Sequence, residues 1–110
     1  MKIFKIVFLV LFCGLNLFAN GTYSKADIER MIAKMVILGF NGENINSNDE
    51  IYKNIKDGLG GVILFDKDPT DKNKIKNVRD KEQLKKLTAQ LQAVSKQKLL
   101  ISIEDRKSVV

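Results

Sequence analysis

The chain has 110 residues, a formal net charge of +6, and a composition that is 45% hydrophobic and 29% charged. This length suits one small domain and is far below the roughly 250 residues of a complete (β/α)8 barrel. The composition excludes a disordered, collagen-like or polytopic membrane protein and predicts a packed core. Because the sequence has no histidine, histidine metal sites, Ser-His triads and imidazole general bases are excluded from this polypeptide.

The amino terminus is typical of a secretory signal peptide. Two lysines precede an apolar run at residues 6–12, and Ala19 supplies a small residue before a cleavage point, so we expect residues 1–19 to be removed. The run is short for the ~20 residues that span a bilayer, which argues against a retained anchor. Cleavage removes both lysines and Cys13, the single cysteine, and lowers the charge from +6 to +4. We therefore expect an exported protein, periplasmic or secreted, that contacts a membrane only through the uncleaved signal.

The first helix and strand are predicted between residues 24 and 42. Ser24 is a good N-cap with Asp27 three residues later, and an apolar stripe follows at Ile28, Met31, Ile32 and Met35. The segment Met35–Phe40 is continuously apolar, which predicts a strand buried on both faces. Asn41-Gly42 predicts a turn directly after it.

A second helix and strand follow. The pattern from Ser47 to Glu50 resembles a capping box, and Gly58 is expected to end the helix in a left-handed conformation. Between them, Ile51 and Ile55 share one face. The segment Val62–Phe65 is apolar and β-branched, as expected of a strand covered on both faces.

The last third of the chain predicts a loop, a helix and a strand. Residues 66–79 read as a polar loop whose lysines and aspartates are not expected in a core. Asp80 is the expected N-cap of a helix, with Gln83 at the reciprocal position. Its apolar stripe is Leu84, Leu87, Leu91 and Val94, and a short strand follows at Leu99–Ile103.

Strands that alternate with amphipathic helices predict an α/β fold with a parallel sheet. Periodicity alone leaves open whether the sheet is doubly wound or part of a barrel. A nucleotide-binding domain is disfavoured because the glycine-rich segment 58–61 precedes a strand, whereas a phosphate loop follows one. No nucleic-acid partner is expected, because the lysines are mixed with acids and no arginine-rich aromatic stripe is present.

Four segments, at 31–42, 60–65, 84–91 and 99–103, carry a resemblance that spans about residues 28 to 105. In this order they resemble the start of a family 3 glycoside hydrolase of the β-N-acetylhexosaminidase type, and Gly-Gly-Val-Ile-Leu-Phe at 60–65 is the most specific. The resemblance implies that residues 20–110 form the first three β/α units of a TIM-type (β/α)8 barrel, incomplete here. It also implies a retaining hydrolase, without a cofactor, that acts on terminal β-linked N-acetylhexosamine in cell-wall glycan.

In that family the third strand ends in Asp-X-Glu-Gly-Gly-X-Val-X-Arg, and the aspartate contacts sugar hydroxyls. Here Glu104 stands at the aspartate position, Val109 matches the motif valine, and residues 106–108 replace Glu-Gly-Gly. Glu104 is thus the one expected substrate-binding residue. No catalytic or metal residue is assigned, because by resemblance the nucleophile and the acid/base histidine lie on later segments. The abrupt loss of the motif predicts a frameshifted or truncated gene. Without the later segments the chain is expected to be inactive alone, and three β/α units with unpaired sheet edges are expected to aggregate.

Other polar residues near strand ends have simpler explanations. Asp66 and Asp68 are explained as solvated loop residues, and Asn41-Gly42 as a turn. Glu104 and Asp105 cannot act together, because successive strand residues face opposite sides of a sheet. An alternative function stays open: a small exported, non-catalytic α/β protein that binds anionic cell-wall polymers through the basic loop at 66–79.

Overall fold

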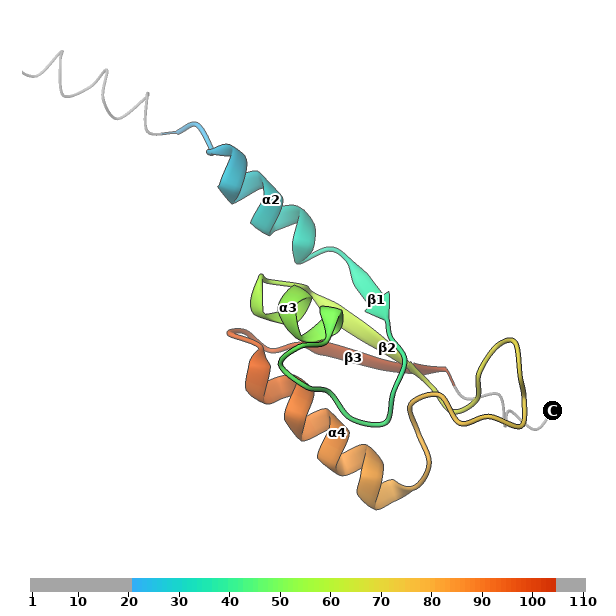
Figure 1. Cartoon of the computed structure of the whole chain (residues 1–110). Coiled ribbons are helices and arrows are strands. Elements are labelled where there is room, and N and C mark those ends of the chain that lie inside the picture. The colour runs from blue at the N-terminus through green and yellow to red at the C-terminus, as the bar shows by residue number, and fades with distance from the viewer. Residues whose placement is uncertain (1–20, 105–110) are drawn as a thin grey trace, which may run out of the picture.

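A computed structural model describes residues 21–104, so the expected signal peptide at 1–19, Cys13 and the segment 105–110 lie outside the described residues. The elements are α2 (Lys25–Ala33), β1 (Ile37–Gly39), α3 (Glu50–Lys56), β2 (Gly61–Phe65), α4 (Lys81–Val94) and β3 (Leu100–Glu104) (Figure 1). The strands form one parallel sheet in the order β1-β2-β3. This confirms the predicted α/β class. Within residues 21–104, none of the helices has the length and apolar character needed to span a bilayer.

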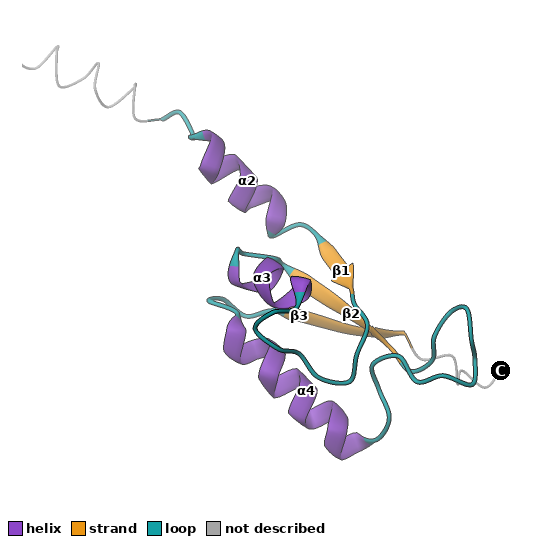
Figure 2. Cartoon of the chain, in the orientation of Figure 1, coloured by secondary structure: helices purple, strands orange, loops and turns teal. Residues whose placement is uncertain are grey.

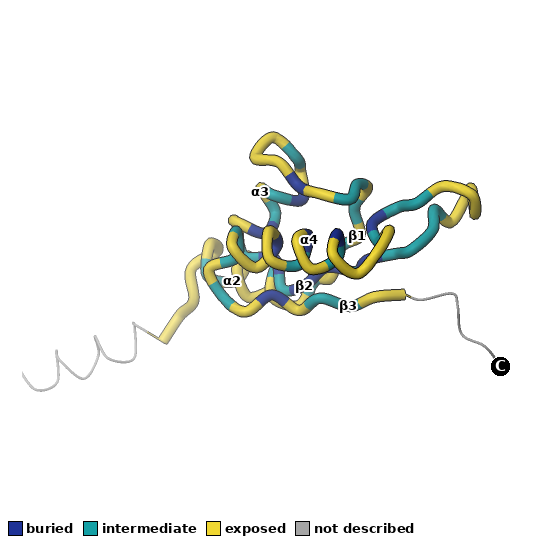
Figure 3. Tube along the Cα trace, turned by 90° about the horizontal axis from the view of Figure 1, so that it is seen from below, coloured by how far each residue is buried: buried dark blue, intermediate teal, exposed yellow. Residues whose placement is uncertain are grey.

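The core lies between the sheet and two helices. Val62 and Leu64 of the central strand β2 are fully buried, and they pack in one cluster with Ile51 and Ile55 of α3 and Leu87 and Leu91 of α4. In the flanking strands, the residues paired with Val62 are Leu38 and Ile101, which pack against the same cluster. Both crossover helices therefore cover one face of the sheet, and the buried positions gather there (Figures 2 and 3).

The other side of the sheet is here called the open face. The alternation of side chains along paired strands assigns eight residues to it: Ile37 and Gly39 of β1, Gly61, Ile63 and Phe65 of β2, and Leu100, Ser102 and Glu104 of β3. Ile37 is 48% exposed and Leu100 is 57% exposed. The expectation that segment Met35–Phe40 is a strand buried on both faces is wrong, because β1 is a three-residue edge strand covered on one side only.

Helix α2 begins as predicted but buries nothing. The Ser24 hydroxyl accepts from the Asp27 amide at 3.1 Å, which confirms Ser24 as the N-cap; the Ser24 amide also donates to the Asp27 carboxylate at 3.2 Å, and the two bonds form a capping box. The helix ends at Ala33, so Met35 falls in the following turn and is 83% exposed. The rest of the stripe, Ile28, Met31 and Ile32, is exposed as well. Among the described residues this helix therefore adds no buried side chain to the core.

The start of α3 differs from the prediction, whereas its end agrees. Ser47 is not the cap: the N-cap residue is Asp49, and its side chain caps no helical amide but accepts from the Asn46 amide at 2.7 Å. Gly58 has a φ of 112°. The amides of Gly58 and the next residue donate to carbonyls of the last helical turn at 3.1 and 3.0 Å, which is the Schellman arrangement that the glycine predicted.

The glycine pair at the start of β2, Gly60 and Gly61, is required by close backbone packing. A Cβ atom on Gly60 would lie 1.9 Å from the carbonyl oxygen of Lys34, and one on Gly61 would lie 2.9 Å from that of Leu100. The Gly60 amide donates to the Ala33 carbonyl at 2.9 Å. These glycines let the chain before β1 and the start of β3 approach β2.

Helix α4 matches its prediction closely. The Asp80 carboxylate accepts from the Gln83 amide at 2.8 Å, and Leu87 and Leu91 are fully buried. Gln83 does not return a bond to the N-cap amide, as a capping box requires. Its side-chain oxygen accepts instead from the amide of Arg79, one residue earlier, at 2.9 Å.

Candidate functional site at the carboxyl end of the sheet

The carboxyl ends of the three strands meet at one edge of the sheet, so the polar residues that end or follow them are the first candidates for a site. Glu104 is the last residue of β3 and is exposed. It is paired in register with Phe65, the last residue of β2. The structure thus includes Glu104 in the strand, where the sequence predicted it just beyond, and places it on the open face.

Phe65 links this edge to the loop at 66–79. The Lys76 ammonium lies 4.5 Å from the centroid of the Phe65 ring, a cation–π contact. Further back in the loop, Lys67 forms an isolated antiparallel bridge with Ile75. The loop therefore folds back over the end of β2 as an ordered hairpin-like segment.

A pocket of about 340 Å³, called here the carboxyl-end pocket, opens between the two loops that follow β1 and β2. It brings together three residues noted in the sequence, Asn41, Gly42 and Asp68. Its other lining residues are Glu43, Lys74, Ile75 and Lys76. Asp66 and Glu104 do not line it; the Asp66 carboxylate accepts from the Lys67 amide at 2.7 Å. The pocket offers amide, carboxylate and ammonium groups, a set suited to hydrogen bonding with polar ligands.

Asp68 is held as an ionised turn residue. Its carboxylate accepts from the Thr70 hydroxyl at 2.6 Å and from the Thr70 amide at 2.8 Å. The hydroxyl bond is the largest cause that lowers the pKa of Asp68, followed by the amide bond. A carboxyl with a lowered pKa is a poor general acid near neutral pH. Asp68 therefore stabilises the loop, in agreement with the simpler explanation from the sequence.

A buried asparagine that the sequence analysis missed holds this end together. The side chain of Asn77 is fully buried; its oxygen accepts from the Phe65 amide at 3.0 Å, and its nitrogen donates to the carbonyls of Phe40 and Gly42 at 3.0 and 2.9 Å. The Gln83 side chain donates to the Asn77 carbonyl at 2.8 Å. The lysines and aspartates of loop 66–79 stay out of the core as expected, but Asn77 near the end of the loop is buried. No local pattern marks Asn77, because two of its partners lie far back in the sequence.

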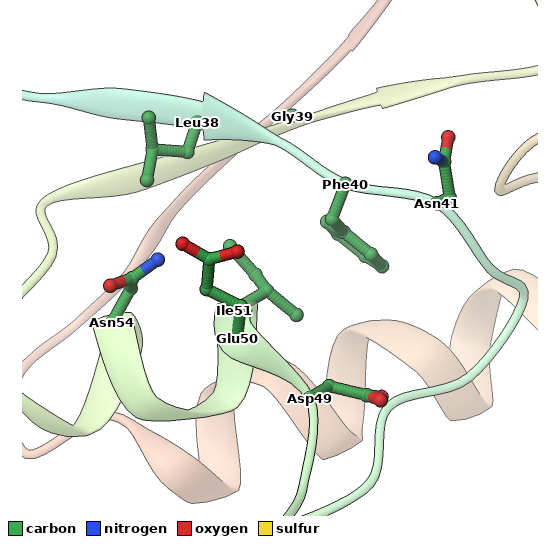
Figure 4. Close-up of a pocket in the computed structure, with 8 residues that line it drawn as sticks. All are labelled: Leu38, Gly39, Phe40, Asn41, Asp49, Glu50, Ile51 and Asn54. Carbon is green, nitrogen blue, oxygen red and sulfur yellow. The ribbon is translucent and has the colours of Figure 1, made fainter.

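A second hollow, the edge groove, runs along the free side of β1. It has a volume of about 460 Å³ and lies between the strand and α3 (Figure 4). Its lining residues are Leu38, Gly39, Phe40, Asn41, Asp49, Glu50, Ile51 and Asn54. The carboxylate of Glu50 and the amide of Asn54 point toward β1 across it. Sequence reasoning assigned Glu50 to a helix cap and did not find this groove, because only the edge position of β1 creates it.

Within residues 21–104, no three Asp, Glu or Cys side chains are grouped so as to bind a metal ion. The carboxyls with clearly lowered pKa values, Asp27, Asp68 and Asp80, each accept hydrogen bonds in a cap or turn. Comparisons with protein-family models, with curated proteins and with solved structures found no match to this chain.

Proposed function

We propose that this chain supplies the first three β/α units of a (β/α)8 barrel that hydrolyses terminal β-linked N-acetylhexosamine, and that it is not catalytic by itself. The observation that carries the proposal is the sheet order β1-β2-β3 with both crossover helices on one face. In a barrel the helices lie outside, the opposite face points inward, and ligands bind at the carboxyl ends of the strands. One half of a doubly wound sheet has the same local arrangement, so the preference for a barrel over a doubly wound sheet rests on the sequence resemblance.

Under this proposal Glu104 contacts the sugar and does not carry out the chemistry. Retaining hydrolysis needs a nucleophilic carboxylate and a separate acid/base group, typically two carboxyl groups about 5 to 5.5 Å apart across the scissile bond. Among the described strand residues of the open face, Glu104 is the only carboxylate. A single carboxylate at the mouth of a barrel can accept hydrogen bonds from sugar hydroxyls, which is the role that the resemblance implies.

Sequencing the DNA downstream of the last codon, and translating it in all three frames, tests the barrel proposal. We expect segments that carry the missing histidine and aspartate to follow, and the joined reading frame to encode a protein that cleaves a chromogenic β-N-acetylglucosaminide. A downstream region with no barrel segment in any frame would contradict the proposal and would favour a small binding protein.

The role of Glu104 has its own test. In the full chain, Glu104→Gln should weaken binding of N-acetylglucosamine by at least about tenfold, because a hydrogen bond to a charged group contributes about 1.5 to 3 kcal/mol. Saturation-transfer NMR measures the binding, and Glu82→Gln on the exposed side of α4 is the matched control. Equal affinity of the two variants would remove Glu104 from the site.

The structure of the loop at 66–79 gives little support to the alternative function, in which this loop binds anionic polymers. The loop carries five basic and three acidic residues, a net charge of +2. Its Lys76 is already placed over the Phe65 ring. Interleaved carboxylates weaken the attraction for an anion, so the loop is a poor candidate for this role.

A further inference from the structure

The end of the sheet opposite the candidate site carries a concentration of positive charge. A hollow of about 370 Å³ opens there, beside the carboxyl-terminal ends of α2 and α3 and the segment after α4. We call it the basic hollow. Its lining residues are Arg30, Lys34, Ile55, Lys56, Asp57, Gly58, Ser95, Lys96 and Gln97. Four cations thus face a single carboxylate, that of Asp57.

Three of these cations are not engaged in an ion pair. Within the part of the chain that the structure describes, Lys34, Lys56 and Lys96 make no ion pair. The fourth cation, Arg30, forms an ion pair with Asp27, whose carboxylate lies 3.6 Å from the Arg30 guanidinium. Lysines held around a concave surface repel one another, and an anion placed between them relieves that repulsion.

The usual role of lysine at helix ends does not account for the whole set. Lys34 caps α2 and Lys56 is the last residue of α3, where a positive charge complements the helix dipole. Lys96 lies beyond Ser95, the C-cap of α4, which is already extended, with a ψ of 133°. Three separate segments therefore bring cations to one hollow. The interaction of a lysine with the end of its own helix does not explain why these cations lie together.

We propose that the basic hollow binds a ligand with closely spaced phosphate groups. Its volume falls within the range of small-molecule sites. Lysine ammonium groups bind phosphate as mobile point charges, and they tolerate different arrangements of the phosphates. The phosphates can come from a soluble polyphosphate or from a lipid headgroup, since both present the same anionic oxygens. This site is independent of the barrel proposal, whose sugar contact lies at the other end of the strands.

Inorganic tripolyphosphate is the first probe. It is titrated into the ¹⁵N-labelled full chain in a nonionic detergent, and amide shifts locate the binding. We expect shifts at Ile55 to Gly58 and at Ser95 to Gln97. In the triple variant Lys34→Gln, Lys56→Gln and Lys96→Gln, affinity should fall at least about tenfold, since three screened contacts together are worth roughly that factor.

The matched control removes the same charge from the opposite end. The triple variant Lys67→Gln, Lys72→Gln and Lys81→Gln should bind tripolyphosphate within about twofold of the unmodified chain, because none of these lysines lines the hollow and salt screens charges over a Debye length of about 10 Å. Circular dichroism checks that both variants keep their fold. Equal losses in the two triple variants, or shifts that avoid the hollow, would overturn the proposal.

A second arm identifies the source of the phosphate. Zwitterionic vesicles with and without phosphatidylglycerol replace tripolyphosphate. Binding that increases with phosphatidylglycerol and is lost in the hollow variant supports a lipid headgroup. Binding of tripolyphosphate with no such increase supports a soluble ligand. Both results support the phosphate site, and failure of both probes refutes it.

Discussion

The buried side chain of Asn77 gives the sharpest test of how the candidate site is built. Replacing it with alanine removes three hydrogen bonds of 2.9 to 3.0 Å and leaves the Phe65 amide and the carbonyls of Phe40 and Gly42 without this partner. A neutral hydrogen bond contributes about 1 kcal/mol net, so Asn77→Ala should lower the free energy of unfolding by about 3 kcal/mol. A domain of this size has about 5 to 15 kcal/mol in total, so the loss is a large share.

Urea unfolding of the full chain, followed by circular dichroism, measures this change. Asn73→Ala is the matched control, because Asn73 is exposed in the same loop and its side chain makes no hydrogen bond among the described residues. The control should change stability by less than about 0.5 kcal/mol. If Asn77→Ala unfolds at the same urea concentration as the control, the loop does not hold the strand ends together and the reasoning is refuted.

Two further predictions concern backbone packing and pH. Gly60→Ala should lower the free energy of unfolding by at least about 2 kcal/mol, because the new Cβ atom would overlap the Lys34 carbonyl. Gly58→Ala should lower it by about 1 kcal/mol, because the new Cβ atom would meet no atom within 4 Å but the φ of 112° is unfavourable for alanine. Thermal melts of the two variants measure both changes. Equal melting temperatures for the two variants would contradict this. The pKa of Asp80 is lowered from 3.8, first by the bond from the Gln83 amide and then by the Arg79 side chain. The Asp80 carboxylate therefore stabilises the fold fully above the pKa that Asp80 has in the unfolded chain. This stabilisation is lost as the pH falls through the lower pKa that Asp80 has in the folded chain. In the unmodified chain, the protection of the Gln83 amide from hydrogen exchange should fall as the pH is lowered, whereas Asp80→Asn should show no such fall. Identical pH profiles of the two proteins would contradict the role of the Asp80 carboxylate.

Local chemistry explains which elements could be predicted. The caps at Ser24 and Asp80 and the stop at Gly58 depend on residues within one turn, so their sequence patterns were sufficient. Ser47 was chosen wrongly because Asp49, two residues later, is an equally good N-cap type. The ends of the strands moved by one or two residues for a similar reason, since pairing with a neighbour decides where a strand stops.

Long-range geometry explains the rest. An apolar segment indicates that a strand prefers burial, but it does not say which faces a helix covers, so the exposure of Ile37 on β1 was not foreseen. The basic hollow was missed because Lys34, Lys56 and Lys96 are isolated in the sequence and meet only in the fold. The place of Glu104 at the carboxyl end of β3 could be predicted because it directly follows the apolar run of that strand, whereas its contact with a sugar stays a prediction.

The composition of the open face bears on the function. A sheet face that contacts water normally carries polar residues at alternate positions along each strand. Here the strand residues of the open face are apolar or small, with one exception. The exception is the charged residue Glu104 at the carboxyl end of β3. Gly39, Gly61 and Ser102 alternate in space with bulky neighbours, a pattern that allows side chains from facing strands to fill an enclosed layer. The barrel proposal accounts for both features: an apolar interior, and a polar contact at the mouth where a sugar would bind.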